Sequence, residues 1–179
     1  PRHGFSHVPE TNRFRAADIA AWLSARDRSR PVVLFAGTPA PHVPWPQNDG
    51  YETAALTVPR NHYDTPEYRA DRARYYTDVT QADSDFGEVL DLVSRELGQD
   101  TIVIFTSDHG VQMPFGKWNL YDEGIRVPLL ISWPGRVSPG RTAAMVNWTD
   151  LLPTLVEALG GTLPAGLEIG RASCRERVC

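Results

Sequence analysis

Cysteine is scarce in this sequence, and long apolar runs are missing. The 179 residues include two cysteines, Cys174 and Cys179, both at the C-terminal end, so cysteine usage says nothing about the redox compartment. No apolar run approaches the roughly 18 to 20 residues that cross a bilayer. Residues 1–9 are polar and hold no apolar core of the kind found in signal peptides. We therefore expect no membrane span, and because the sequence does not begin with Met, its first residues say little about export.

An excess of positive charge is also missing. Lys and Arg number 18 against 22 Asp and Glu, the net charge is −4 and the isoelectric point is near 5.7. Charged residues are interspersed along the chain, which argues against a surface built for phosphate backbones, so we do not expect nucleic acid as a partner. The length and the hydrophobic content of 41% predict one compact globular domain.

The last residues break the pattern of the chain before them. The segment from Ile169 to Cys179 resembles the in-frame translation of a common sequencing-library adapter, and we exclude it from the fold. Without its three Arg and one Glu, the counts fall from 18 to 15 basic and from 22 to 21 acidic residues, a net charge of −6. A natural basic tail is the alternative. We assign residues 1–168 to the domain and residues 169–179 to a non-native tail.

Three segments carry apolar residues at the spacing of three and four that is typical of an amphipathic helix. They cover residues 15–25, residues 66–97 and a segment that begins near Thr149. Thr149 is a candidate N-cap, and Pro153 falls in the first turn, where a missing backbone donor costs little. In this last helix, four residues are expected to face inward: Leu152, Leu155, Val156 and Leu159.

Three short apolar runs predict buried strands, over residues 32–37, 101–106 and 127–133. The long helix leads directly into the second run, which is half of a βαβ crossover. We therefore predict an α/β fold with a mostly parallel central sheet flanked by helices. After the first run, closely spaced prolines hold the chain extended and place His42 on a stiff loop, which continues as a long surface excursion to about Pro66.

Polar residues that follow the strands of a parallel sheet lie at one rim, where ligands bind. His42 follows the first run, and Asp108 and His109 follow the second. Because Gly110 permits a sharp turn, the Asp108 carboxylate and the His109 imidazole could share one metal ion. The alternative is that Asp108 caps a loop and His109 bonds to the backbone. Two ligands are too few for Ca²⁺, which takes about 6 to 8 oxygens, so further ligands would come from elsewhere.

Lys117 lies in a loop that returns toward the same rim, and it could neutralise an anionic substrate group. The alternative is an ordinary solvated lysine, and Arg126 has a similar alternative as an ion-pair partner of Asp122 or Glu123. The remaining histidines have no partner at an informative spacing, and we interpret them as surface or satisfied groups: His3, His7 and His62. Packing is the expected role of Trp118 and Trp133.

Several motifs in one order resemble the sulfatases of the alkaline-phosphatase-like superfamily. They are Thr106-Ser-Asp-His-Gly110, the run from Gly116-Lys-Trp-Asn-Leu-Tyr-Asp-Glu-Gly to Trp133-Pro-Gly135, and Thr149-Asp-Leu-Leu-Pro-Thr154. Pro41-His-Val-Pro44 and the helix with Asp83 and Gly87 resemble earlier segments of that family. The resemblance covers most of residues 31–161 and is closest to heparan N-sulfatase-like and bacterial arylsulfatase-like members. It implies the alkaline-phosphatase-like α/β fold.

The resemblance also implies roles for four residues. Asp108 and His109 match ligands of a divalent cation, which is usually Ca²⁺ in sulfatases. His109 stands where many members have Asn, and because nitrogen is an unusual ligand for Ca²⁺, Mn²⁺ and Zn²⁺ are the alternatives. Lys117 matches the lysine that contacts a sulfate oxygen. His42 matches the histidine that binds sulfate or lies beside the leaving-group oxygen.

Sulfatases use a hydrated formylglycine nucleophile, made from Cys or Ser in a Cys/Ser-x-Pro-x-Arg motif. This sequence holds no such motif, and it also lacks the paired-Asp metal motif and the Lys and His that follow the nucleophile. The resemblance therefore implies a truncated catalytic domain whose nucleophile lies upstream, and we expect the isolated fragment to be inactive. The implied reaction is covalent attack on sulfur, while the cation and Lys117 stabilise the sulfate oxygens.

Two other functions stay open. One is a phosphoesterase or phosphonate hydrolase of the same superfamily, which the Asp-His pair favours and the Gly-Lys-Trp-Asn run disfavours. The other is a binding module that keeps the fold without the chemistry. For the sulfatase, the expected partner is a small sulfated substrate or a sulfated sugar, and the resemblance implies a periplasmic or secreted location.

Overall fold

The computed structural model of the chain describes residues 5, 7, 8, 14–163 and 165. The chain divides into two compact units, residues 1–137 and residues 138–179, and each is described here by itself. The proposed adapter-derived tail (169–179), with both cysteines, and His3 lie outside the described residues. Within them, no helix is both long enough and apolar enough to cross a membrane.

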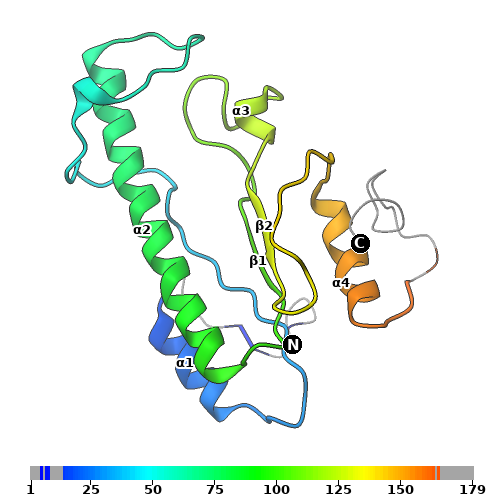
Figure 1. Cartoon of the computed structure of the whole chain (residues 1–179). Helices are drawn as coiled ribbons and strands as arrows, with labels where there is room; N and C mark the ends of the chain where they lie inside the picture. The colour runs from blue at the N-terminus through cyan, green and yellow to red at the C-terminus, as the bar shows by residue number, and fades with distance from the viewer. Residues whose placement is uncertain (1–4, 6, 9–13, 164, 166–179) are drawn as a thin grey trace. The chain divides into compact units, whose positions relative to one another are not determined.

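The first unit is built along one long helix, α2 (Pro66–Glu96) (Figure 1). The Thr65 hydroxyl caps its first turn by accepting from the Tyr68 amide at 3.2 Å, and Pro66 occupies a position where its missing donor costs nothing. The helix ends before Gly98, whose φ of +77° is a left-handed conformation that favours glycine. The helix predicted over residues 66–97 is thereby confirmed.

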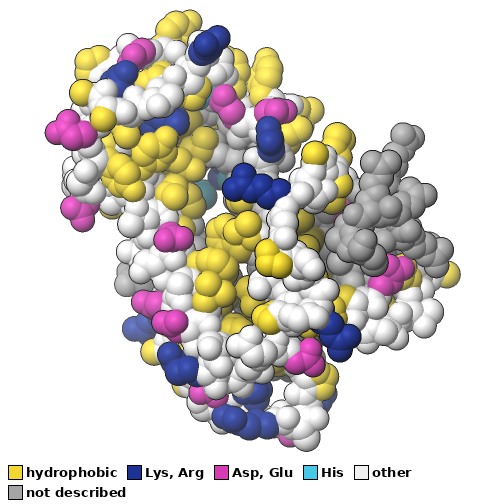
Figure 2. Space-filling model, in the orientation of Figure 1, with side chains coloured by type: hydrophobic (Ala, Val, Ile, Leu, Met, Phe, Trp, Pro, Cys, Tyr) yellow, Lys and Arg dark blue, Asp and Glu magenta, His cyan; other side chains and the backbone are white. Residues whose placement is uncertain are grey.

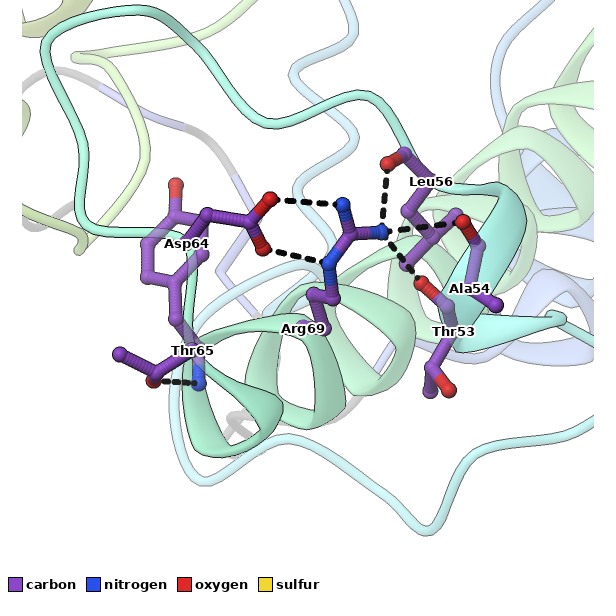
Figure 3. A network of polar contacts seen from close by, with 7 residues as sticks. Thr53, Ala54, Leu56, Asp64, Thr65 and Arg69 are labelled. Atoms are coloured by element: carbon purple, nitrogen blue, oxygen red, sulfur yellow. Dashed lines mark hydrogen bonds and ion pairs between the residues drawn. The ribbon is translucent and has the colours of Figure 1, made fainter.

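A guanidinium group ties the preceding loop to the start of α2 (Figure 3). Arg69 donates to both carboxylate oxygens of Asp64, at 2.5 and 2.9 Å. It also donates to three backbone carbonyls in and beside the short 3₁₀ helix η2 (Thr53–Ala55): Thr53, Ala54 and Leu56, at 2.8, 3.1 and 2.9 Å. The hydrogen bond from Arg69 holds the pKa of the Asp64 carboxyl below its usual value. The Arg69 side chain therefore holds together the loop over residues 53–64, which contains no strand and no long helix.

The predicted first helix is confirmed as α1 (Ala16–Ala25), which packs near the C-terminal end of α2 (Figure 1). Its Leu23 side chain is fully buried. Just after the helix, Arg26 donates to the Glu96 carbonyl at 3.1 Å, and Arg28 pairs with the Glu96 carboxylate at 2.9 Å. Two arginine contacts thus tie the end of α1 to the end of α2.

The sheet of the described residues has two strands, β1 (Val103–Thr106) and β2 (Leu129–Ser132). They pair antiparallel, with Val103 opposite Ser132 and Thr106 opposite Leu129. The predicted parallel arrangement is therefore not confirmed, because the chain between the two strands forms a folded loop rather than a crossover helix. Such a loop returns the second strand beside the first in the opposite direction.

The first predicted strand, over residues 32–37, is extended but forms no ladder within the described part of the chain. Its Val33 and Phe35 side chains are exposed, so the prediction of a strand buried on both faces is wrong for this structure. By contrast, β1 packs on the long helix through Phe105, whose ring lies 4.6 Å from that of Phe86. Figure 2 shows many further hydrophobic side chains, in yellow, at the surface between charged ones.

The second unit contains the 3₁₀ helix η3 (Trp148–Asp150) followed by α4 (Leu151–Ala158). The predicted helix is confirmed, but its cap is Asn147 rather than Thr149. The Asn147 side chain accepts from the Thr149 amide at 2.8 Å, and the Asp150 carboxylate accepts from the Asn147 amide at 2.9 Å. This reciprocal pair is a capping box, which satisfies two backbone donors at once.

Burial in α4 differs in part from the expected inward stripe. Pro153 is buried, whereas Leu152 and Leu159 are exposed, so the inward placement of these two leucines is wrong within the described structure. Leu155 and Val156 are partly buried. Gly160, with φ +73°, follows the end of the helix.

Candidate functional site

The loop between β1 and β2 (residues 107–128) carries three of the four predicted site residues. It is closed by backbone hydrogen bonds: the Gly110 amide donates to the Gly124 carbonyl at 2.9 Å, and the Lys117 amide donates to the Val111 carbonyl at 2.8 Å. The short helix α3 (Asp122–Ile125) lies in its second half. These bonds hold residues 110–117 against the loop's own far end, so the site residues sit on a folded scaffold.

Glycines make this close packing feasible. A Cβ atom at Gly110 would lie 1.7 Å from the Glu123 carbonyl oxygen, and one at Gly116 would lie 2.0 Å from the Val111 carbonyl oxygen. Gly124 is similarly placed, with 2.4 Å to the Asn119 carbonyl oxygen. Each glycine therefore faces a backbone oxygen at a distance that excludes any side chain unless the loop moves.

Lys117 and His42, which are 75 residues apart in the sequence, lie in contact. The Lys117 Nζ atom is 3.0 Å from His42 Nε2, and His42 Nδ1 is 2.6 Å from the Val43 carbonyl oxygen. Since that oxygen only accepts, Nδ1 carries the proton and Nε2 presents its lone pair to the ammonium group. The backbone thus orients the imidazole, and Lys117 donates to its Nε2 atom.

Two residues beside Lys117 have unusual backbone conformations. Phe115 and Trp118 have φ values of +62° and +71°, in the left-handed region that bulky residues rarely adopt. The Trp118 side chain is 83% exposed, and Lys117 Nζ lies 5.4 Å from its ring centroid. The predicted packing role of Trp118 is therefore wrong for this structure. Trp133 is half-buried, and its indole N–H donates to Asp100 Oδ1 at 3.2 Å.

Asp108 and His109 form a neighbouring pair at the end of β1. Asp108 Oδ2 lies 3.5 Å from His109 Nε2, while Asp108 Oδ1 accepts from the His109 amide at 2.9 Å. His109 Nδ1 donates to the Gly110 carbonyl at 2.8 Å. The backbone contacts expected if Asp108 caps a loop and His109 bonds to the backbone are therefore present. They leave Asp108 Oδ2 and the lone pair of His109 Nε2 next to each other.

The chemistry of this pair fits part of a divalent-cation site. A metal-binding histidine typically donates its other ring N–H to a carbonyl, as His109 does here. Two ligand atoms on one ion, at about 2.1–2.5 Å each and at a right angle, lie roughly 3–3.5 Å apart, which matches the observed separation. Asp108 is 81% exposed and reachable. Within the described residues no group of three or more His, Cys, Asp or Glu gathers, so the pair supplies only part of a ligand set.

Asp108, His109 and Lys117 lie on this loop and His42 lies on another segment, but the two pairs are not joined to each other. Among the described residues, no hydrogen bond or ion pair joins Asp108 or His109 to Lys117 or His42. Within the loop, the Lys117 amide donates to the Val111 carbonyl, so Lys117 is held to the segment that directly follows Asp108 and His109.

Sequence reasoning missed one pair that supports this loop. Glu123, weighed as a partner for Arg126, instead contacts His62, with 2.7 Å between Glu123 Oε2 and His62 Nε2. Arg126 pairs with Asp122 at 4.0 Å, which confirms the other predicted partner. His62 was expected to be a surface or satisfied group, and it is buried and satisfied. No spacing signal could reveal its partner, because the two residues are 61 positions apart.

Comparison with known proteins gives a consistent family. A sequence model described as Sulfatase matches residues 13–161. Mouse steryl-sulfatase is 31% identical over 171 residues, covering 84% of this chain and 25% of that protein. Human N-sulphoglucosamine sulphohydrolase is 41% identical over 115 residues, covering 60% of this chain and 22% of that protein.

Solved structures agree with these sequence matches. A Bacteroides fragilis protein described as a sulfatase superposes with a TM-score of 0.76 at 25% identity, covering 89% of this chain and 39% of that one. The chain spans about a fifth to a quarter of the length of the curated relatives described above. Since the family's sequence model covers most of the chain, the chain belongs to the sulfatase family.

Proposed function

We propose that this chain is part of the catalytic domain of a metal-dependent sulfatase that hydrolyses sulfate esters or sulfamates. The observation that carries the proposal is the contact between Lys117 and His42, which brings a cation and an oriented imidazole together from distant parts of a sulfatase sequence. The sequence holds no Cys/Ser-x-Pro-x-Arg motif, so we assign the formylglycine nucleophile to a segment outside it.

Lys117 binds and neutralises the sulfate group in this proposal. Its ammonium group has three donors, and the structure uses one of them toward His42. The others can donate to sulfate oxygens as negative charge develops on them, which is the electrostatic stabilisation that lowers such barriers most. The contact between Lys117 and His42 is exposed to solvent, so a sulfate group can approach the ammonium group.

His42 exchanges a proton with the departing oxygen. Its Nδ1 proton is held by the Val43 carbonyl, so Nε2 is the atom that can accept a proton and deliver it to the leaving group. The short loop that holds it is folded by a turn in which the His42 amide donates to the Pro39 carbonyl at 2.7 Å. The imidazole is therefore pre-oriented before substrate binds.

Asp108 and His109 would hold the cation through Oδ2 and Nε2. Ca²⁺ is the first candidate by family, while the nitrogen donor also suits Mn²⁺ or Zn²⁺. When bound, the cation supplies positive charge that polarises the sulfate group. We propose small sulfated substrates or sulfated sugars as the substrate class, which agrees with the name of the human relative.

The test compares Lys117→Ala with Arg126→Ala in the longer protein that supplies the nucleophile. Loss of one charge-stabilising donor is expected to lower kcat/KM for an aryl sulfate by about 10²–10³-fold. Arg126 is exposed and paired only at 4.0 Å with Asp122, so its variant should keep nearly full activity. Equal activity of the Lys117 variant and the parent would overturn the assignment.

The nitrogen donor of His109 favours one alternative, a phosphoesterase of the same superfamily. Turnover of an aryl phosphate exceeding that of the matching aryl sulfate would select it. A longer protein that binds Ca²⁺ and turns over neither ester would select a binding module.

A further inference from the structure

His62, whose side chain is buried, pairs with the partly exposed Glu123 next to the candidate site. The His62 side chain is 2% exposed, and its Nε2 lies 2.7 Å from Glu123 Oε2. The other carboxylate oxygen accepts from Asn61 Nδ2 at 3.0 Å. The His62 ring also packs against Phe115, with 5.6 Å between ring centroids. The loop before α2 is therefore joined to the site loop by both polar and apolar contacts.

The hydrogen bonds of this pair have a defined direction. Because the Glu123 carboxylate only accepts, His62 Nε2 carries the proton, and Nδ1 accepts from the Tyr68 hydroxyl on α2. Burial raises the pKa of that hydroxyl, so it stays a donor at neutral pH. Arg72 completes the chain by donating toward the Tyr68 oxygen at 3.4 Å. A directed series of donors thus runs from the rigid helix to Glu123.

The backbone of Glu123 and Gly124 contacts the turn that carries Asp108 and His109. Its carbonyl oxygen faces Gly110 so closely that a Cβ there would lie 1.7 Å away, and the neighbouring Gly124 carbonyl accepts from the Gly110 amide at 2.9 Å. Gly110 directly follows Asp108 and His109, and its own carbonyl accepts from His109 Nδ1. A shift of Glu123 would therefore move the group that orients the His109 ring.

We propose that His62 and Glu123 are positioning residues, which hold the site loop against α2 so that Asp108 and His109 keep their metal-binding geometry; this rests on the proposed function. Neither residue touches the candidate ligand atoms of the Asp108 and His109 pair. Their effect passes through the backbone of Glu123 and Gly124. A charge-assisted hydrogen bond to a buried imidazole is suited to this role, because removing its partner would leave the buried His62 N–H group unpaired.

The test uses the chain itself with four variants. His62→Ala removes the donor, His62→Gln keeps an N–H donor that can reach Glu123, and Glu123→Gln removes the charge while keeping the shape. The matched control is Asp122→Asn, which makes the same charge change at an exposed neighbouring carboxylate. The readouts are amide hydrogen exchange at Gly110 and Lys117, the ring ¹⁵N signals of His109, and Mn²⁺ affinity.

We expect His62→Ala to speed exchange at Gly110 and Lys117 by about tenfold or more, and to weaken Mn²⁺ binding by about 10–100-fold. His62→Gln should restore most of both losses, and Glu123→Gln should lie between. The His109 ring signals should shift in the alanine variant. Asp122→Asn should change none of these values.

Three outcomes would overturn the proposal: unchanged exchange at Gly110 in the alanine variant, equal acceleration across the amides of α2, or no rescue by glutamine. If His62→Ala does not fold, Glu123→Gln decides by the same measurements. If the parent chain fails to bind Mn²⁺, the proposed metal site fails, while exchange and ring signals still decide whether the pair positions the loop.

Discussion

At the residue scale, the conformation of the site loop depends on three glycines that have no Cβ atom. Gly110, Gly116 and Gly124 each face a carbonyl oxygen at a distance that a Cβ cannot occupy. Lys117 and His42 meet through one nitrogen each, with the second His42 nitrogen held by the backbone. The site is therefore specified by small residues that permit contact as much as by the polar residues that make it.

Replacing Gly110 by alanine tests this statement. We expect Gly110→Ala to lower the free energy of unfolding by about 1–3 kcal/mol or more, because the new methyl group overlaps the Glu123 carbonyl. Gly87→Ala is the matched control, since no atom lies within 4 Å of its Cβ position in α2 and alanine favours helix by about 1 kcal/mol. Urea unfolding measures both. Equal effects of the two substitutions would contradict the close approach at Gly110.

At the scale of elements, the start of α2 organises a loop that has little regular structure. Arg69 bridges Asp64 and three carbonyls, and Thr65 caps the first turn. Because this loop also contains His62, the anchoring of α2 reaches the site loop through Glu123. The helix α2 thus supports the loop before it directly and the site loop through the contact of His62 with Glu123.

The pairing of Asp64 with Arg69 predicts a pH dependence. The pKa of Asp64 is lower in the folded protein than its ordinary value of 3.8, so the folded state binds this proton less readily. Its stabilisation is present above that ordinary value and is lost as the pH falls through the lowered pKa. Asp64→Asn should therefore be less stable than the parent at pH 7, and this difference should disappear as the pH falls below the lowered pKa of Asp64.

Urea unfolding of both proteins across pH 2 to 7 measures this effect. In an Arg69→Gln background, Asp64→Asn should show no such pH dependence, because the partner is missing. A stability difference that stays constant over the whole range would contradict the assignment of the pKa shift to Arg69.

At the scale of the whole molecule, the chain matches only part of the length of its curated relatives. It spans a fifth to a quarter of the length of the described curated relatives and leaves many hydrophobic side chains exposed, among them Val33, Phe35 and Leu130. Exposed apolar surface of this kind commonly marks an interface. The described residues supply one pair of metal-ligand candidates and one pair for the sulfate group.

We accordingly expect the isolated chain to be catalytically inactive, because its sequence contains no formylglycine motif to supply the nucleophile. A continuous assay with an aryl sulfate measures this directly. Addition of Ca²⁺ or Mn²⁺ should not restore activity. Turnover above that of the Lys117→Ala variant would show that the chain contains a nucleophile of its own.

The helices and the family could be predicted from local information. The helical spacing of apolar residues located α1 and α2 well, because this signal lies within a few residues of the chain. The ordered motifs around Asp108 and Lys117 indicated the family, which the match over residues 13–161 confirms.

The tertiary structure alone decided which distant residues meet. The positions of β1 and β2 could be predicted from their apolar residues. Their antiparallel register could not, because strand pairing depends on how the intervening loop closes. The contacts of Lys117 with His42 and of Glu123 with His62 join residues 75 and 61 positions apart. The sequence by itself determined the elements, the family and the candidate residues. Folding determined their partners, because the geometry of a loop depends on carbonyls and glycines that leave no periodic signal.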